Sequence, residues 1–84
     1  MIKVRVEIKL KKGIVDPEGK NILKALNLLG FKNIKNVKTS KIVEMLIDEK
    51  DENNVAKEVE EMCKKLLVNP VVNDYSVEIE NVQE

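Results

Sequence analysis

Apolar and charged residues alternate without a break at the N-terminus. The apolar positions are Ile2, Val4, Val6, Ile8 and Leu10, and the charged positions between and after them are Lys3, Arg5, Glu7, Lys9 and Lys11. A repeat of two residues is the side-chain period of a β-strand with one face buried. The pattern therefore predicts an N-terminal strand that turns its apolar face to a core and its charged face outward.

A helix with both ends marked follows this strand. Asp16 can cap the free N–H groups of a first turn, and Pro17 suits the first helical position. Gly30 stands where a left-handed C-terminal cap is expected, with Phe31 placed to fold back on the last turn. Gly19 is unusual in the first turn because glycine weakens a helix, and close approach of another backbone is one explanation. The apolar residues at helical spacing are Ile22, Leu26 and Leu29, with Leu23, Ala25 and Leu28 beside them.

Two more strands are predicted between residues 34 and 49. Residues 34–40 carry a weak strand pattern, whereas residues 41–49 alternate clearly. The apolar face of the clearer strand consists of Val43, Met45 and Ile47. A tight connection near residues 39–41 predicts that the two strands form a hairpin.

A second helix and a final strand complete the pattern. The apolar stripe of this helix consists of Val55, Val59, Met62 and Leu66. Acidic residues gather in its first half, and Lys64 and Lys65 lie in its last turn, as the helix dipole favours. Asn69 and Pro70 end the helix. Residues 75–80 then alternate between apolar and polar side chains, which predicts a last strand.

The resulting order is β-α-β-β-α-β, and 84 residues of 9.6 kDa fit one domain spanning residues 1–84. This order predicts an α+β two-layer sandwich, in which both helices cover one face of a four-stranded antiparallel sheet. Right-handed crossovers would place the first strand between the third and the fourth. The predicted architecture is ferredoxin-like, or a close relative in which segments are exchanged between chains.

The sheet face that the helices leave open carries both charges and apolar residues. On the first strand it presents Lys3, Arg5, Glu7 and Lys9, and on the predicted neighbours Glu44, Asp48, Glu78 and Glu80. Opposite charges on adjacent strands pair favourably, so the basic stripe is expected to be neutralised within the sheet. Ile42 and Leu46 share this face. They are either part of a surface that binds a partner or two ordinary exposed aliphatic residues.

Composition narrows the candidate chemistry. Fifteen basic and fifteen acidic residues cancel, so no overall field favours nucleic acid or a membrane, and neither is expected as a partner. There is no His and one Cys, which excludes an internal disulfide and a Cys-rich zinc site. Cys63 is therefore interpreted as a packing residue. The start does not resemble a signal peptide, and the expectation is a cytoplasmic protein without an active site, metal or cofactor of its own.

Several segments together resemble a known family. They are the alternating Val4–Lys11, the helix start Val15–Gly19, the dipeptide Ser40–Lys41 before a strand with Glu44, and the block Glu61–Tyr75 before an acidic last strand. Over essentially the whole chain, this combination is similar to the PurS subunit family of phosphoribosylformylglycinamidine synthase, also called formylglycinamide ribonucleotide amidotransferase.

The resemblance implies a role without chemistry of its own. In this family a large synthetase subunit binds ATP, Mg²⁺ and formylglycinamide ribonucleotide and activates the amide oxygen by phosphorylation. A glutaminase subunit releases ammonia from glutamine. The small subunit, as a dimer or tetramer, is expected to bridge the two and to assist ammonia transfer, so that the complex forms formylglycinamidine ribonucleotide for purine synthesis.

The resemblance also implies the positions that matter. The motif positions are Asp16, Pro17, Gly19, Lys41, Asn69, Pro70, Asp74 and Tyr75, and Ile42 and Leu46 join them as candidate interface residues. None is expected to be catalytic. An alternative hypothesis from the residues alone is a regulatory dimer of ferredoxin-like fold that binds a small molecule.

Overall fold

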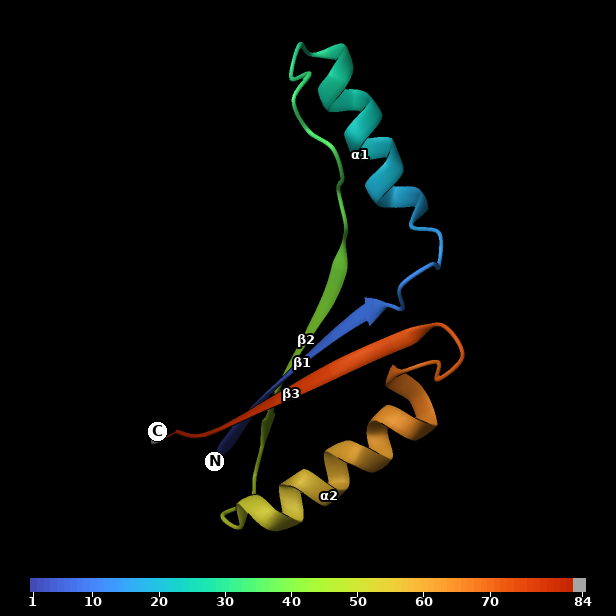
Figure 1. The fold of residues 1–84 in the computed structure, drawn as a ribbon. Helices are drawn as coiled ribbons and strands as arrows, with labels where there is room; N and C mark the ends of the chain where they lie inside the picture. The colour runs from blue at the N-terminus through green and yellow to red at the C-terminus, as the bar shows by residue number, and fades with distance from the viewer. Residues whose placement is uncertain (83–84) are drawn as a thin grey trace.

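The computed structural model describes residues 1–82 (Figure 1). Its elements are β1 (Ile2–Leu10), α1 (Pro17–Leu28), β2 (Ser40–Ile47), α2 (Glu52–Met62), the single π-helical turn η1 (Cys63–Leu67) and β3 (Asn73–Asn81). The two predicted helices and three of the four predicted strands are therefore present.

The strands form one antiparallel sheet with β1 in the middle, in the order β2-β1-β3. Val6 lies opposite Val43 on one side and opposite Val77 on the other. This confirms the predicted position of the first strand between the clearer middle strand and the last one. Its apolar side chains all point to one face, as the alternation predicts, and Ile2, Val4 and Val6 are fully buried.

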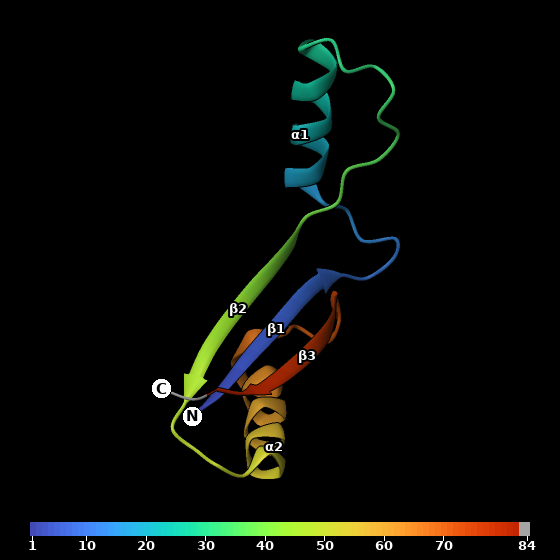
Figure 2. The same ribbon diagram turned by 90° about the vertical axis from the view of Figure 1, so that its left-hand side faces the viewer.

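The predicted strand at residues 34–40 and its hairpin are wrong. Most of this segment runs beside α1 without pairing in the sheet, and β2 begins only at Ser40 (Figures 1 and 2). The backbone N–H of Thr39, which a hairpin would use in its ladder, instead donates to the Asp16 carboxylate at 2.7 Å. A local side-chain acceptor therefore takes the place of a strand partner.

Only α2 covers the sheet, so the prediction that both helices pack on one face is wrong for α1 (Figures 1 and 2). α1 projects past the end of the sheet on two chain segments, residues 11–16 and 31–39. Residues 11–39, which include α1, are called the arm below, and the two segments that flank the helix are called its neck. The ferredoxin-like sandwich is not present in the described residues, because the segment expected as its second strand forms part of the neck.

The core lies between the sheet and α2. It contains Ile2, Val4, Val6, Ile8, Val55, Val59, Cys63 and Val68. The predicted stripe of the second helix is right at Val55 and Val59 but wrong at Leu66, whose side chain is 84% exposed. The π-helical turn η1 changes the helical period, so Leu67 packs against the core in its place. Cys63 is buried, as expected of a packing residue, and this burial, with a smaller effect of Glu60, raises the pKa of its thiol.

Both predicted ends of α1 are confirmed. Asp16 caps the first turn and Pro17 occupies its first position. At the other end Gly30 has φ +103°, and the N–H of Phe31 donates to Leu26 O at 3.0 Å, which closes the helix with a left-handed glycine cap. The Phe31 side chain is still 54% exposed.

The projecting arm makes the molecule long. Its extents are 50 × 31 × 15 Å and its radius of gyration is 16.7 Å, against about 12 Å for a compact domain of this length. The accessible surface is 6669 Å², against roughly 5,100 Å² for a compact chain of this mass. The chain thus exposes about 1,600 Å² more than a compact monomer would.

Candidate functional site

Most of the predicted motif positions lie at one end of the sheet. Because β1 is antiparallel to both neighbours, its C-terminal end lies beside the starts of β2 and β3. Lys41 and Tyr75 both lie opposite Ile8 in the next strand, and Asp74 lies opposite Lys9. The turn before β3 and the base of the arm adjoin this end, which is called the neck end below. The members of this set are Asp16, Pro17, Gly19, Lys41, Asn69, Pro70, Asp74 and Tyr75.

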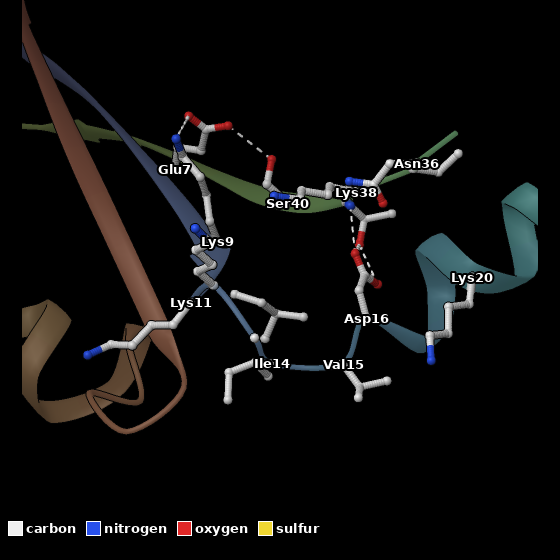
Figure 3. A pocket seen from close by; sticks show the side chains of 15 residues that line it. Glu7, Lys9, Lys11, Ile14, Val15, Asp16, Lys20, Asn36, Lys38 and Ser40 are labelled. Atoms are coloured by element: carbon white, nitrogen blue, oxygen red, sulfur yellow. Dashed lines mark hydrogen bonds and ion pairs between the residues drawn. The ribbon is translucent and has the colours of Figure 1, made fainter. Parts of the chain in front are cut away.

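Asp16 ties the two sides of the neck together. Its Oδ1 accepts the N–H of Gly19 at 2.9 Å, and its Oδ2 accepts the N–H of Thr39 at 2.7 Å and the Thr39 hydroxyl at 2.9 Å (Figure 3). These donors, the N–H of Gly19 first, lower the pKa of Asp16. The helix cap was predictable from the sequence. Thr39 was missed, because its side chain and N–H meet Asp16 from 23 residues away and leave no local pattern.

Gly19 is buried because another backbone approaches it closely. A Cβ at this position would lie 2.5 Å from Val37 O and 2.9 Å from Asp16 Oδ2. This confirms the explanation suggested by the sequence, that a glycine is needed at position 19 because another backbone segment comes close. Pro17, Gly19 and Asp16 together fix where α1 begins and how closely the returning segment passes it.

Asn69 and Pro70 organise the turn between α2 and β3. Asn69 O accepts the N–H of Val72 at 3.1 Å with Pro70 second in the turn, and Asn69 Oδ1 accepts the N–H of Val71 at 3.0 Å. The side chain of Asn73 accepts the N–H of Asn69 at 2.9 Å and donates to Lys9 O at 3.2 Å. This turn is therefore fastened to the end of β1, and Val71 at its tip is 77% exposed.

A cleft of about 550 Å³ opens between the neck and the end of the sheet (Figure 3). Inside it the Ser40 hydroxyl donates to Glu7 Oε2 at 3.0 Å, as the Thr39 hydroxyl does to Asp16. No imidazole is available to activate either hydroxyl. Across residues 1–82, no group of three Cys, Asp or Glu side chains is placed to hold a metal ion. The arrangement suits a site that orients segments or binds a partner.

The charges of the open sheet face are paired across strands in part, and one of the predicted pairs forms an ion pair in the described residues. Lys3 Nζ lies 3.3 Å from Glu44 Oε2, and Arg5 stands opposite Glu44 on one side and Glu78 on the other. Ile42 is 39% exposed and Leu46 is 55% exposed on this face. Ile42 directly follows Lys41 but is on the opposite face of β2, and Leu46 lies farther along the strand, away from the cluster of motif positions. Whether they contact a partner remains a prediction.

Lys41 is exposed at the start of β2, beside a smaller pocket of about 400 Å³ that Ile8, Leu67 and Asn73 also line. Tyr75 is 41% exposed on the strand across β1 from it. The neck end thus presents accessible, partly apolar side chains beside a hydrogen-bonded turn. None of the helices in the described part of the chain is long and apolar enough to cross a membrane.

Comparison with known proteins decides the family. The model of the family described as "PurS: Phosphoribosylformylglycinamidine (FGAM) synthase" matches residues 3–81. The chain belongs to the PurS family. The resemblance inferred from the sequence motifs is confirmed, and the chain is by membership a subunit of FGAM synthase, a ligase of purine biosynthesis. No catalytic role of its own is indicated.

Individual relatives agree over the full length. The PurS subunit of phosphoribosylformylglycinamidine synthase from Methanocaldococcus jannaschii is 51% identical over 99% of this chain and 100% of that one. The crystal structure of PurS from that organism superimposes with a TM-score of 0.89 at 52% identity, covering 99% of this chain and 100% of that chain. A chain in the structure named PurLQS from Thermotoga maritima has a TM-score of 0.73 at 25% identity, covering 94% and 96%.

Proposed function

We propose that the chain is the non-catalytic bridge of the synthase complex. In this role it holds the glutaminase subunit against the large synthetase subunit and assists the passage of ammonia between them. The complex then converts formylglycinamide ribonucleotide to formylglycinamidine ribonucleotide with glutamine as the nitrogen source. The chain itself binds no cofactor, since ATP and Mg²⁺ are used by the synthetase subunit, and it works in the cytoplasm as a homo-oligomer.

The observation that carries this proposal is the exposed surface of the extended molecule. About 1,600 Å² beyond that of a compact monomer is accessible. Six large apolar residues of the arm are among the exposed ones: Ile14, Val15, Ile22, Leu28, Leu29 and Phe31. Large apolar side chains exposed together on one segment mark sites of association. A protein that presents so much of it, and no catalytic constellation, is suited to assembly.

Two separate surfaces support a bridging role. The neck end carries Lys41, Tyr75 and the exposed tip at Val71, whereas Ile42 and Leu46 lie on the open face of the sheet. One chain can therefore contact one neighbour by its end and another by its face. The similarity to a chain in the structure named PurLQS further supports a place in an assembly of several subunits.

Ammonia chemistry gives the reason for a bridge. Ammonia released into water becomes protonated and is then no longer a nucleophile. Its transfer between two active sites must therefore be shielded, and shielding requires that the two subunits stay in a fixed relation. A small rigid scaffold meets this need without catalytic residues.

Co-elution tests the bridging role. The synthetase and glutaminase subunits of the same organism are mixed with glutamine, with and without this chain, and run on a sizing column. We expect one complex of all three proteins that forms only when the chain is present. A stable pair of the two large proteins without it, and no co-elution of the chain, would contradict the proposal.

The open face can be tested in the same experiment. The double variant Ile42→Asp/Leu46→Asp is expected to keep its circular dichroism spectrum but to join the complex at least tenfold more weakly. The control Asn54→Asp/Ala56→Asp places the same two charges on exposed positions of α2. Equal binding of both double variants would remove Ile42 and Leu46 from the interface.

A further inference from the structure

We propose that the cleft between the neck and the end of the sheet binds a small phosphorylated molecule, of the size of a nucleoside phosphate or a sugar phosphate. The cleft volume of about 550 Å³ lies within the usual range for sites that bind small molecules. The cleft holds this ligand without changing it, since no imidazole is available to activate its hydroxyl groups. The molecule is therefore a ligand of the chain and not a cofactor of the reaction, and the site does not depend on the bridging role.

Five lysines line the cleft, and they come from four parts of the chain (Figure 3). Lys9 lies on β1, Lys11 and Lys12 follow that strand, Lys20 lies on α1, and Lys38 lies on the segment that returns to the sheet. Positions so far apart in the sequence are brought around one cleft only by the fold of the neck.

The positive charge of the cleft is not balanced by its own carboxylates. Glu7 and Asp16 are the acidic residues of its lining, so the lysines exceed them by three. Both carboxylates accept hydrogen bonds from neutral donors, Asp16 from Thr39 and Glu7 from the Ser40 hydroxyl. Within residues 1–82, Lys9 is the one lysine of the five with an ion-pair partner, Glu7 Oε1 at 4.0 Å from its Nζ. The other four can pair with a bound anion.

The charge of the cleft contrasts with that of the remaining chain. The whole chain has fifteen basic and fifteen acidic residues, so the residues outside the cleft comprise ten basic and thirteen acidic ones. A concave surface lined by one sign of charge focuses the electric field and raises the local concentration of counter-ions. The cleft therefore attracts anions although the chain as a whole is neutral.

The lining of the cleft matches a ligand with a charged end and an uncharged end. Lysine is a common ligand of phosphate, because its ammonium group donates charge-assisted hydrogen bonds to phosphate oxygens. Leu10, Ile14, Val15 and Val37 also line the cleft, and Ile14 is 40% exposed. These apolar side chains provide a surface on which the sugar or base of the ligand can pack.

The same features favour a small molecule over a polymer. Proteins that bind single-stranded nucleic acid stack its bases on aromatic side chains, but Phe31 and Tyr75, the two aromatic residues of the chain, do not line the cleft. An acidic protein segment has single charges spread along its backbone. A phosphate monoester concentrates about two charges at one point, which suits lysines gathered around one cleft.

Some of the lysines must turn for the ligand to bind. In Figure 3 the side chains of Lys11 and Lys20 extend away from the middle of the cleft. Each ammonium group stands on a flexible four-carbon stem and can turn toward a ligand, at the cost of side-chain freedom. The expected binding is therefore reversible and dependent on salt.

The position of the cleft connects ligand binding to the neck. A ligand that contacts Lys20 and Lys38 joins the start of α1 to the returning segment, the two sides that Asp16 joins from within. Since a ligand stabilises the state that binds it, the bound molecule should hold the two sides of the neck together. Amide exchange of Thr39 should then become slower.

Titration of the full-length chain tests the site. The probes are ATP, AMP and ribose 5-phosphate, and the readouts are calorimetry and the backbone amide chemical shifts of residues 9–16 and 36–40. We expect saturable binding of at least one probe, with shifts in both segments and slower amide exchange of Thr39. Binding should weaken as salt is added, because exposed charges are screened.

Paired variants separate the cleft from general electrostatics. Lys20→Gln/Lys38→Gln removes two charges from exposed positions at the cleft, and the control Lys50→Gln/Lys57→Gln removes two from exposed positions outside it. The cleft variant should bind the probe about tenfold more weakly or worse, whereas the control should bind like the parent. Both variants should keep the urea midpoint of the parent, which shows that any loss of binding is not a loss of folding.

Three results would overturn the proposal: no saturable binding of any of the three probes, equal binding by the two double variants, or chemical-shift changes confined to residues outside the cleft. A polyglutamate peptide serves as the competing probe. If it binds the cleft more tightly than the phosphorylated molecules, the site belongs to an acidic protein segment and the proposal is wrong. Because the titration uses this chain alone, its outcome is separate from the co-elution of the three subunits.

Discussion

Replacing Gly19 by alanine should weaken the protein, although alanine is the better helix former. In a helix interior alanine is favoured over glycine by up to about 1 kcal/mol, and less in the first turn. Here the new Cβ would lie 2.5 Å from Val37 O, a backbone atom, and 2.9 Å from Asp16 Oδ2. Relieving such overpacking costs about 1–3 kcal/mol, because the neck must shift. The net expectation is a destabilisation of about 1–2 kcal/mol.

The assay for this variant is urea unfolding at fixed protein concentration, together with amide exchange of Thr39. Asn21→Ala is the control, since it also raises helix propensity in α1 but at an exposed position. We expect the control to be neutral or stabilising, and Gly19→Ala to unfold at lower urea with faster exchange at Thr39. A Gly19→Ala protein as stable as the control, with unchanged exchange at Thr39, would refute the close backbone approach as the reason for this glycine.

Three further expectations concern stability and reactivity. Val55→Ala removes two fully buried methyl groups from the core and should cost about 2 kcal/mol in urea unfolding, whereas the exposed Val71→Ala should change little. Because the pKa of Asp16 is lowered in the folded protein, its contribution is complete above its ordinary value of 3.8 and lost as the pH falls through the folded value. Thr39 amide exchange, corrected for its intrinsic pH dependence, should therefore accelerate in acid, and Asp16→Asn should abolish that change. Cys63, buried and with a raised pKa, should react with a thiol reagent only after unfolding; rapid reaction of the native protein would contradict its place in the core.

The sequence was most informative where structure is set by neighbours along the chain. The alternation of residues 2–10 predicted β1 and its buried face, because side chains that repeat every two residues lie on the same face of a strand. The ends of α1 were equally predictable, since Asp16 and Gly30 each cap the helix through contacts within one turn.

Structural features that depend on contacts between residues far apart in the sequence could not be predicted. Residues 34–40 have enough apolar positions for a strand, but the Thr39 N–H bonds to Asp16, which no local pattern reveals. The π-helical turn at residues 63–67 exposes Leu66, which a regular helix would bury. The apolar stripe of α1 predicted an amphipathic helix, but it did not reveal that this helix projects past the end of the sheet.

In the candidate site, too, the local roles of residues could be predicted, whereas their arrangement in space could not. The helix-boundary roles of Asp16, Pro17, Asn69 and Pro70 were predictable from residue type and are visible in the hydrogen bonds. That these positions gather with Lys41 and Tyr75 at one end of the sheet follows only from the antiparallel register, which pairs the strand starts with the end of β1.

Steady-state synthesis of formylglycinamidine ribonucleotide tests the central claim most directly. The synthetase and glutaminase subunits are assayed with ATP and Mg²⁺, with and without this chain, using either glutamine or a high concentration of ammonium chloride as the nitrogen source. If the chain is a bridge that assists ammonia transfer, the rate of product formation with glutamine should require the chain, whereas the rate with ammonium chloride should not. Equal glutamine-dependent rates with and without the chain would contradict the account.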